Sequence, residues 1–231
     1  MIRIHRLKLM ALCLLFANAA GAADALASLS AAESTDGLKA ALTQAAGVAI
    51  STLGKTDGFM ADPEVRIPLP GKLQKASKTA RKLGLGKQID ALTLAMNRAA
   101  EAAVPESREM LMQSIKQMSV KDAVGVLKGP ENAATEYFRK SMSDKLGEKF
   151  LPIVRKATAD VKLAEVYKDV AGKASALGLI DSSDASIDAY VTRKTLDGLF
   201  LVMAREEAAI RKNPLQQANA LLRKVFGSLG K

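Results

Sequence analysis

Apolar residues recur at intervals of three and four positions along nearly the whole chain after residue 34. This spacing places them on one face of an α-helix and is typical of amphipathic helices that pack around a shared core. Apart from one short segment, residues 64–70, no convincing strand pattern appears. The pattern therefore predicts an all-α protein: one multi-helix domain of about ten helices over residues 23–231. The predicted helices cover about residues 35–53, 72–83, 87–104, 131–146, 148–159, 161–177 and 186–212, with others starting at Pro105, after Ser119 and at Pro214.

Several helix ends are predicted from capping residues. Thr35-Asp36 is expected to open the first helix, and Ser119 to Asp122 resembles a capping box with Asp in place of Glu. Proline is expected at the first helical position after Val104 and after Asn213. Two turns share the pattern A-x-x-L-G-L, around Gly84 and Gly178, which is typical of a Schellman helix stop. An ancient duplication is the alternative explanation for that pair.

One segment, EVRIPLP over residues 64–70, interrupts the helical pattern. Its prolines favour extended geometry in the residues before them. Val65, Ile67 and Leu69 would then point to one side and Arg66 to the other. We predict an extended segment that packs three apolar side chains on the helical core, with no place inside a sheet because proline lacks an N–H donor.

Residues 1–22 have the features of a secretory signal peptide. Basic residues precede the apolar run LMALCLLFANAA, which is too short to span a bilayer. Cleavage is expected after Ala22, or alternatively after Ala19. The sequence thus predicts export to the periplasm as a soluble chain without a transmembrane segment.

Cleavage would change the available chemistry. Cys13 and His5 are the single cysteine and histidine of the chain, and it has no tryptophan. Thiol nucleophiles, zinc sites built on Cys or His, and a Ser-His-Asp triad are therefore excluded from residues 23–231. No metal or cofactor is expected. The full chain carries +10, and three basic residues lie in the signal, so +7 remains.

Seven stretches together resemble a family of secreted bacterial proteins known as domain of unknown function 4197. They are GFMADPEVRIPLP (58–70), LGLGKQID (83–90), MNRAAEAA (96–103), AATEYFR (133–139), KFLPIV (149–154), YVTRKTLDGLF (190–200) and REEAAIRKNP (205–214). The resemblance covers essentially all of residues 23–231. It implies one exported helical domain, and it brings no activity, cofactor or catalytic residue with it.

Positive charge is concentrated directly after the extended segment. Seven basic residues follow one another without an acidic residue between them: Arg66, Lys72, Lys75, Lys78, Arg81, Lys82 and Lys87. On the predicted helix, an apolar side containing Leu73, Ala80 and Leu83 lies opposite the lysines. The charge either only keeps the protein in solution or binds an anionic partner. The helix lacks aromatic residues, so we expect surface attraction without membrane insertion.

Polar residues on otherwise apolar helices form a second candidate site. They are Asn97, Arg98, Glu101, Asp197, Arg205, Glu206, Glu207 and Arg211. Glu207 and Arg211 are four apart and so face each other on a helix. Three interpretations remain open for the set: ion pairs between helices, the lining of a polar pocket, and a catalytic carboxylate pair.

The stretch AATEYFR contributes a third candidate. Thr135, Tyr137 and Arg139 lie near the start of a predicted helix, where free N–H groups can hold an anion with Arg139 as a counter-charge. Packing in the core is the alternative for Tyr137. The acidic residues of 181–188 lack the glycine and final glutamate of an EF-hand loop, so helix capping is expected there and no calcium site.

These observations favour a non-enzymatic binding protein that attaches to an anionic envelope component through its basic helix. Phospholipid headgroups, lipopolysaccharide, acidic glycans and acidic proteins all fit, whereas nucleic acid does not fit a periplasmic address. A small-molecule or lipid carrier with a pocket between helices is one alternative. A carboxylate-dependent hydrolase or lyase is the other. The oligomeric state stays open.

Overall fold

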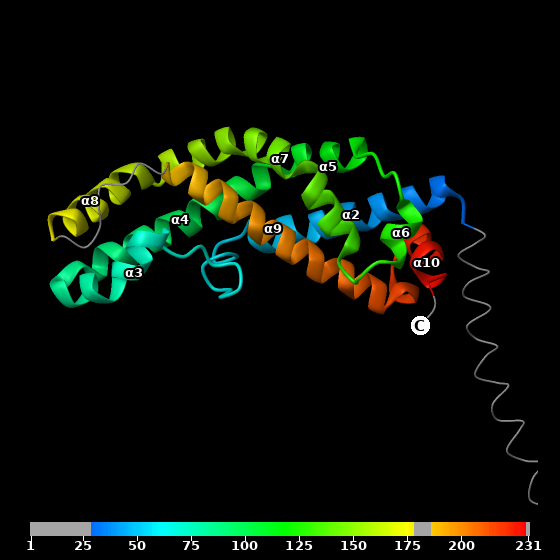
Figure 1. Ribbon diagram of the computed structural model, residues 1–231, viewed down its shortest axis with the longest axis horizontal. Coiled ribbons are helices and arrows are strands. Elements are labelled where there is room, and N and C mark those ends of the chain that lie inside the picture. Colours follow the sequence, from blue (N-terminus) through cyan, green and yellow to red (C-terminus); the bar gives the residue numbers. More distant parts are fainter. Residues whose placement is uncertain (1–28, 178–185, 230–231) are drawn as a thin grey trace, which may run out of the picture.

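A computed structural model describes residues 29–177 and 186–229, apart from the side chains of Lys72 and Ser175 (Figure 1). The predicted signal peptide and the turn at Gly178 lie outside these residues. No strand occurs in the part described, which confirms the all-α prediction. The elements are α2 (Ala31–Leu53), α3 (Gly71–Ala80), the kinked turn η1 (Arg81–Leu85), α4 (Gly86–Glu106), α5 (Arg108–Gln117), α6 (Ala123–Lys128), α7 (Ala133–Asp160), α8 (Leu163–Ala176), α9 (Ile187–Lys212), the 3-10 turn η2 (Pro214–Gln216) and α10 (Ala220–Gly227).

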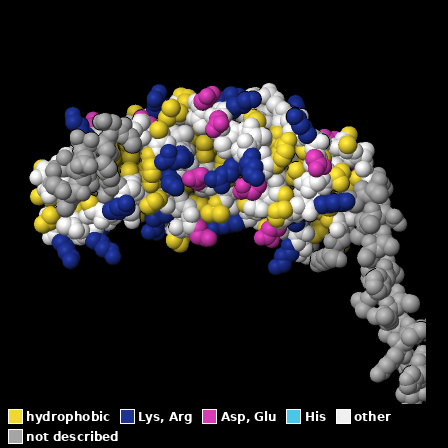
Figure 2. Space-filling model, in the orientation of Figure 1, with side chains coloured by type: hydrophobic (Ala, Val, Ile, Leu, Met, Phe, Trp, Pro, Cys, Tyr) yellow, Lys and Arg dark blue, Asp and Glu magenta, His cyan; other side chains and the backbone are white. Residues whose placement is uncertain are grey.

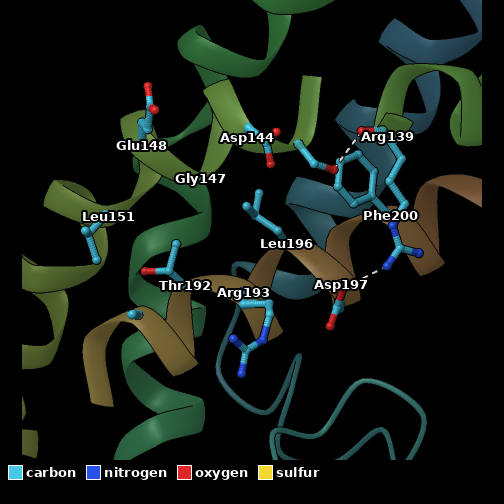
Figure 3. A pocket seen from close by; sticks show the side chains of 12 residues that line it. Arg139, Asp144, Gly147, Glu148, Leu151, Thr192, Arg193, Leu196, Asp197 and Phe200 are labelled. Atoms are coloured by element: carbon cyan, nitrogen blue, oxygen red, sulfur yellow. Dashed lines mark hydrogen bonds and ion pairs between the residues drawn. The ribbon is translucent and has the colours of Figure 1, made fainter. Parts of the chain in front are cut away.

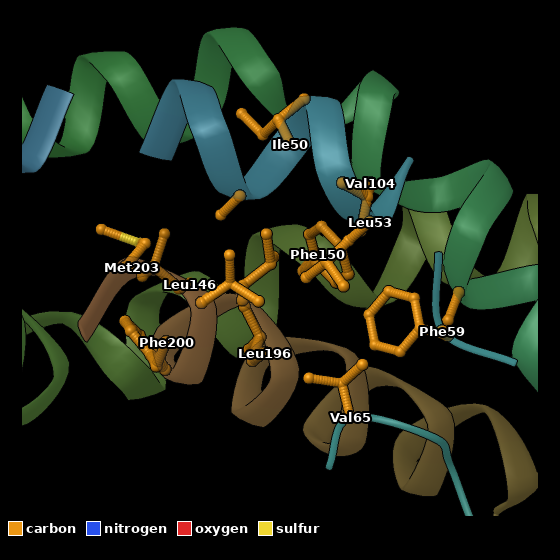
Figure 4. Close-up of a cluster of buried hydrophobic side chains, with 14 of the residues drawn as sticks. Ile50, Leu53, Phe59, Val65, Val104, Leu146, Phe150, Leu196, Phe200 and Met203 are labelled. Atoms are coloured by element: carbon orange, nitrogen blue, oxygen red, sulfur yellow. The ribbon is translucent and has the colours of Figure 1, made fainter. Parts of the chain in front are cut away.

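The long helices α2, α4, α7 and α9 form the body of an elongated bundle (Figure 1). Helix α9 packs along both α2 and α7, and α4 packs along α7 and α8. Helices α3 and α8 lie at one end of the long axis, while α6 and α10 lie at the other. Fully buried aromatic rings, among them Phe59 and Phe150, fill the space between the long helices (Figure 4). None of the described helices is long and apolar enough to cross a membrane.

Four predicted helix starts differ from the structure, and in three of them another residue caps the helix. Helix α2 starts before Thr35: Glu33 N–H donates to Ser30 Oγ at 3.1 Å, and Ser30 N–H donates to Glu33 Oε2 at 3.0 Å. Asp122, and not Ser119, caps α6 by accepting the Gly125 N–H at 2.7 Å.

The other two differences involve proline. Pro105 lies in the last turn of α4, and Pro214 starts only the short turn η2. Asn219 instead caps α10, because its Oδ1 accepts the Leu221 N–H at 2.9 Å.

Helix α7 joins two helices that the sequence predicts as separate, 131–146 and 148–159. It runs through Gly147 and Pro152 without a break. Leu146 and Phe150 flank the glycine and are completely buried on one side of the helix. Burial of such side chains outweighs the roughly 1 kcal/mol that glycine costs inside a helix. The described residues therefore contain slightly fewer helices than the ten predicted.

The extended segment has the alternation that the sequence predicts. Val65, Ile67 and Leu69 are buried, whereas Arg66 and Pro68 are exposed. Its first two residues belong to a turn over residues 63–65, and residues 66–70 have no regular structure. The segment therefore crosses the bundle with three apolar side chains in the core.

The turn between α3 and α4 agrees with the sequence at one residue and differs at another. Gly84 has a φ of 88°, the left-handed conformation expected at a helix stop. Leu83 is predicted on the packed side but is 52% exposed, and Leu85 is buried in its place. The kink at Gly84 explains the difference, because its left-handed conformation ends the regular helix and redirects the chain, so that Leu85 after the turn packs on the core in place of Leu83.

Candidate functional site

Four lysines cover the end of the molecule that carries α3. Lys75 and Lys78 come from α3, Lys82 from η1 and Lys87 from the first turn of α4, and all four side chains are exposed. We call these four residues the basic tip. Figure 2 shows dark blue side chains at this end, over α3. Within the described residues, no carboxylate forms an ion pair with any of the four.

The other three basic residues of the predicted stretch do not belong to the basic tip. The Arg81 guanidinium pairs with Asp90 at 2.5 Å, which lowers the pKa of that carboxyl and raises the pKa of Arg81. Arg66 Nε donates to the Met60 carbonyl at 2.6 Å and lies beside α9, away from the tip. The Lys72 side chain lies outside the described residues. The structure thus brings together four of the seven predicted residues.

The loop before the extended segment is held by a buried carboxylate. Glu101 is 4% exposed, and its Oε1 accepts the N–H groups of Phe59 and Met60 at 3.1 Å each. Its Oε2 pairs with Arg98 at 2.5 Å. The loop in turn places the Phe59 ring against α9, where a Cβ on Gly198 would lie 2.7 Å from it. Glu101 and Gly198 together fix this loop on the bundle.

Two further side chains hold the extended segment itself. Asn97 Oδ1 accepts the Ile67 N–H at 2.8 Å, and Asn97 Nδ2 donates to the Ile67 carbonyl at 3.0 Å. The side-chain amide therefore pairs with the main chain as a neighbouring strand would. The Tyr190 hydroxyl on α9 donates to the carbonyls of Pro68 and Leu69 at 2.9 and 3.3 Å. Burial raises the pKa of Tyr190.

The start of α7 holds an anion, and that anion is a side chain of the protein. Glu207 on α9 is 1% exposed and accepts the N–H groups of Ala134 and Thr135 at 2.9 and 2.7 Å. The Thr135 hydroxyl also donates to it at 2.8 Å. The expected counter-charge, Arg139, lies elsewhere, and Arg211 pairs with Glu207 at 2.9 Å instead.

Arg211 extends this contact to a second helix end. Its Nη1 donates to the Leu127 carbonyl at 2.7 Å, at the C-terminus of α6. The Glu207–Arg211 pair thus places a negative charge at the start of α7 and a positive charge at the end of α6, the favourable sign at each end. Glu101 and Glu207 bind different main-chain groups, so the structure does not bring these two carboxylates to one site.

Asp197 of the second candidate set and Arg139 of the third line the same hollow. A groove of about 660 Å³ runs between α7 and α9, and its lining includes Arg139, Asp144, Leu196 and Asp197 (Figure 3). Arg139 and Asp197 form an ion pair of 3.0 Å across it. The Arg139 guanidinium also lies 5.6 Å from the centre of the Phe200 ring.

A second hollow of about 450 Å³ shares Arg139 and Asp197 with the first and reaches the extended segment at Arg66. Lys194 adds a second cation to Asp197 at 3.4 Å. The other members of the predicted set lie elsewhere: Asn97, Arg98 and Glu101 hold the loop and the extended segment, Arg205 pairs with Asp62 at 3.2 Å, and Glu206 accepts a hydrogen bond from Gln44 at 3.1 Å.

A family model described as protein of unknown function (DUF4197) matches residues 28–227. The chain belongs to this family. No curated protein and no solved structure match it. The match confirms the resemblance carried by the seven sequence stretches. It extends over α2 to α10, so the basic tip and the groove both lie in the matched part.

The positions of three residues of this DUF4197 chain are not predicted by the sequence. Phe59 and Tyr190 anchor the loop and the extended segment, and Leu83 is exposed at the basic tip. A glycine in the middle of a long helix, Gly198, was the available signal for Phe59, since such a glycine marks a close approach. The sequence around Tyr190 carried no comparable signal, because its partners are more than 120 residues away.

Proposed function

We propose that the protein is a non-enzymatic binding protein of the cell envelope that attaches to an anionic, phosphate-bearing component through the basic tip. The predicted signal peptide supports the location. The observation that carries the proposal is the display of Lys75, Lys78, Lys82 and Lys87 at one end of an elongated molecule. Charges gathered at an end can all face one flat surface at the same time.

The strength of this attraction follows from general magnitudes. A basic residue near an anionic membrane surface contributes about 1 kcal/mol at physiological salt. Four such residues contribute about 4 kcal/mol, which corresponds to roughly a thousandfold in affinity. This is enough for reversible attachment and too weak for permanent anchoring. The attachment weakens as salt rises, because exposed charges are screened beyond a Debye length of about 8 Å at physiological ionic strength.

The two alternative functions have less support. The buried carboxylates that a hydrolase or lyase would use, Glu101 and Glu207, are occupied by main-chain N–H groups. The hollows beside α9 open to solvent and are lined by charged side chains such as Arg139 and Asp197, whereas an apolar cargo requires an enclosed apolar cavity. The basic tip is therefore the better-supported site.

Sedimentation with vesicles and with lipopolysaccharide tests the proposal. In the test variant, all four lysines of the basic tip become glutamine. The matched control loses the same charge at exposed lysines elsewhere, namely Lys128, Lys140, Lys149 and Lys212. We expect binding to at least one of the two phosphate-bearing materials by the wild type and the control, falling with salt, and a loss of about a thousandfold in the test variant. Equal binding by the two variants would refute the proposal.

A further inference from the structure

The basic tip contains an exposed leucine. Leu83 lies in η1 next to Lys82, and 52% of it is accessible to solvent. Single exposed leucines are ordinary on protein surfaces. Leu83 differs by its position, since it stands inside the run of basic residues that follows the extended segment. Figure 2 shows yellow and dark blue side chains together at this end of the molecule.

The turn holds Leu83 outward. Ala80 before it and Leu85 after it are both buried, so the main chain is fixed on each side. Gly84 supplies the left-handed conformation with a φ of 88°. The Arg81–Asp90 ion pair connects η1 to α4. Leu83 is therefore presented by a closed, anchored turn and needs no rearrangement to contact a surface.

From this arrangement we infer that the basic tip binds an anionic phospholipid bilayer and that Leu83 inserts between its headgroups. The inference rests on the proposed function and names its partner. It replaces the expectation of attraction without insertion, which placed Leu83 on the packed side of the helix. A bilayer offers phosphates to the lysines and, a few ångströms deeper, an apolar layer to the leucine. An acidic glycan or an acidic protein surface offers the charge without that layer. Attraction and insertion then act at the same point of the molecule.

The size of the insertion effect follows from the exposed fraction. Burial of a leucine side chain is favourable in proportion to the apolar area removed from water, and about half of the area of Leu83 is still available for burial. Insertion should therefore strengthen vesicle binding about fivefold to tenfold. Unlike the lysine contribution, this part should persist when salt is raised.

The experiment places a fluorescent reporter at the proposed point of insertion. The chain contains no tryptophan, so Leu83→Trp gives indole emission from position 83 alone. The control is Leu215→Trp, since Leu215 is 77% exposed and lies near the end of α9, away from α3. Vesicles are made of equal parts phosphatidylglycerol and phosphatidylcholine, or of phosphatidylcholine alone. A second variant, Leu83→Ser, measures the contribution of the side chain to affinity.

We expect the emission of Leu83→Trp to shift to shorter wavelength with the anionic vesicles and to be quenched by brominated acyl chains. The emission of Leu215→Trp should not change, and neutral vesicles should shift neither variant. Leu83→Ser should bind the anionic vesicles about fivefold to tenfold more weakly than the wild type.

Three results would overturn the inference, and they separate it from the proposed function. Lysine-dependent vesicle binding without a shift for Leu83→Trp, or with an equal shift for Leu215→Trp, overturns insertion and leaves the proposed function standing. Lysine-dependent binding to lipopolysaccharide but not to vesicles overturns the bilayer as the partner. Absence of any lysine-dependent binding overturns both the inference and the proposed function.

Discussion

The Glu207–Arg211 pair makes a prediction about stability that can be tested closely. Glu207→Gln keeps the size of the side chain and removes its charge. It leaves Arg211, which is only 10% exposed, without its carboxylate. It also replaces one oxygen by an NH₂ group that faces the N–H donors of Ala134 or Thr135. The substitution therefore disturbs the start of α7 and the end of α6 at the same time.

The expected loss is large because the pair is buried. Breaking a buried ion pair by removing one partner costs about 3–5 kcal/mol, and the retained size of glutamine places the loss near 3 kcal/mol. A domain of this kind is stable by about 5–15 kcal/mol in total. Glu206→Gln is the matched control on the same helix. Glu206 is half-buried and accepts one hydrogen bond from Gln44, so its loss should cost less than about 1 kcal/mol.

Urea unfolding followed by circular dichroism measures both free energies. We expect the midpoint of Glu207→Gln to fall well below that of the wild type, and the midpoint of Glu206→Gln to stay close to it. The reasoning would be refuted by a free energy of unfolding for Glu207→Gln within about 1 kcal/mol of the control. Such a result would mean that the pair contributes no more than an ordinary surface contact.

Two further predictions concern pH. Burial raises the pKa of Tyr190 above its usual value of about 10. The stability that the buried, neutral Tyr190 contributes is therefore present below about pH 10 and is lost as pH rises through the folded-state pKa. In thermal unfolding above about pH 10, Tyr190→Phe should lose less stability than the wild type. The hydrogen bond from Lys224, together with those from Ser30, lowers the pKa of Glu33 from 4.5 to about 2. The stability that the ionised Glu33 contributes is present above pH 4.5 and is lost as pH falls to about 2. The difference in melting temperature between the wild type and Lys224→Gln should therefore shrink over this range. A constant difference would contradict the prediction.

The sequence predicts those features that depend on local interactions. Helical periodicity locates the long helices, and the two prolines of the extended segment predict the burial of Val65, Ile67 and Leu69. Helix ends are predicted less accurately, because several residues near each end can cap it. Ser30 instead of Thr35 at the start of α2 is an example.

The partners of polar residues cannot be predicted from spacing. The sequence indicates that the start of α7 could hold an anion, but Glu207 is 72 residues from Thr135 and only tertiary packing brings them together. The same holds for Asn97, whose partner Ile67 is 30 residues away. The burial of Leu83 is predicted wrongly for a different reason: the chain kinks at Gly84, so the regular helical period that the prediction assumes ends there.

Lysine acetylation in the presence and absence of anionic phospholipid vesicles tests most directly whether the basic tip is the binding surface. It uses the unmodified sequence, and mass spectrometry reports each lysine separately. We predict that Lys75, Lys78, Lys82 and Lys87 become protected by vesicles of equal parts phosphatidylglycerol and phosphatidylcholine. Lys128, at the end of α6 on the opposite end of the bundle, should react equally in both conditions. Protection of Lys128 without protection of the basic tip would contradict the account.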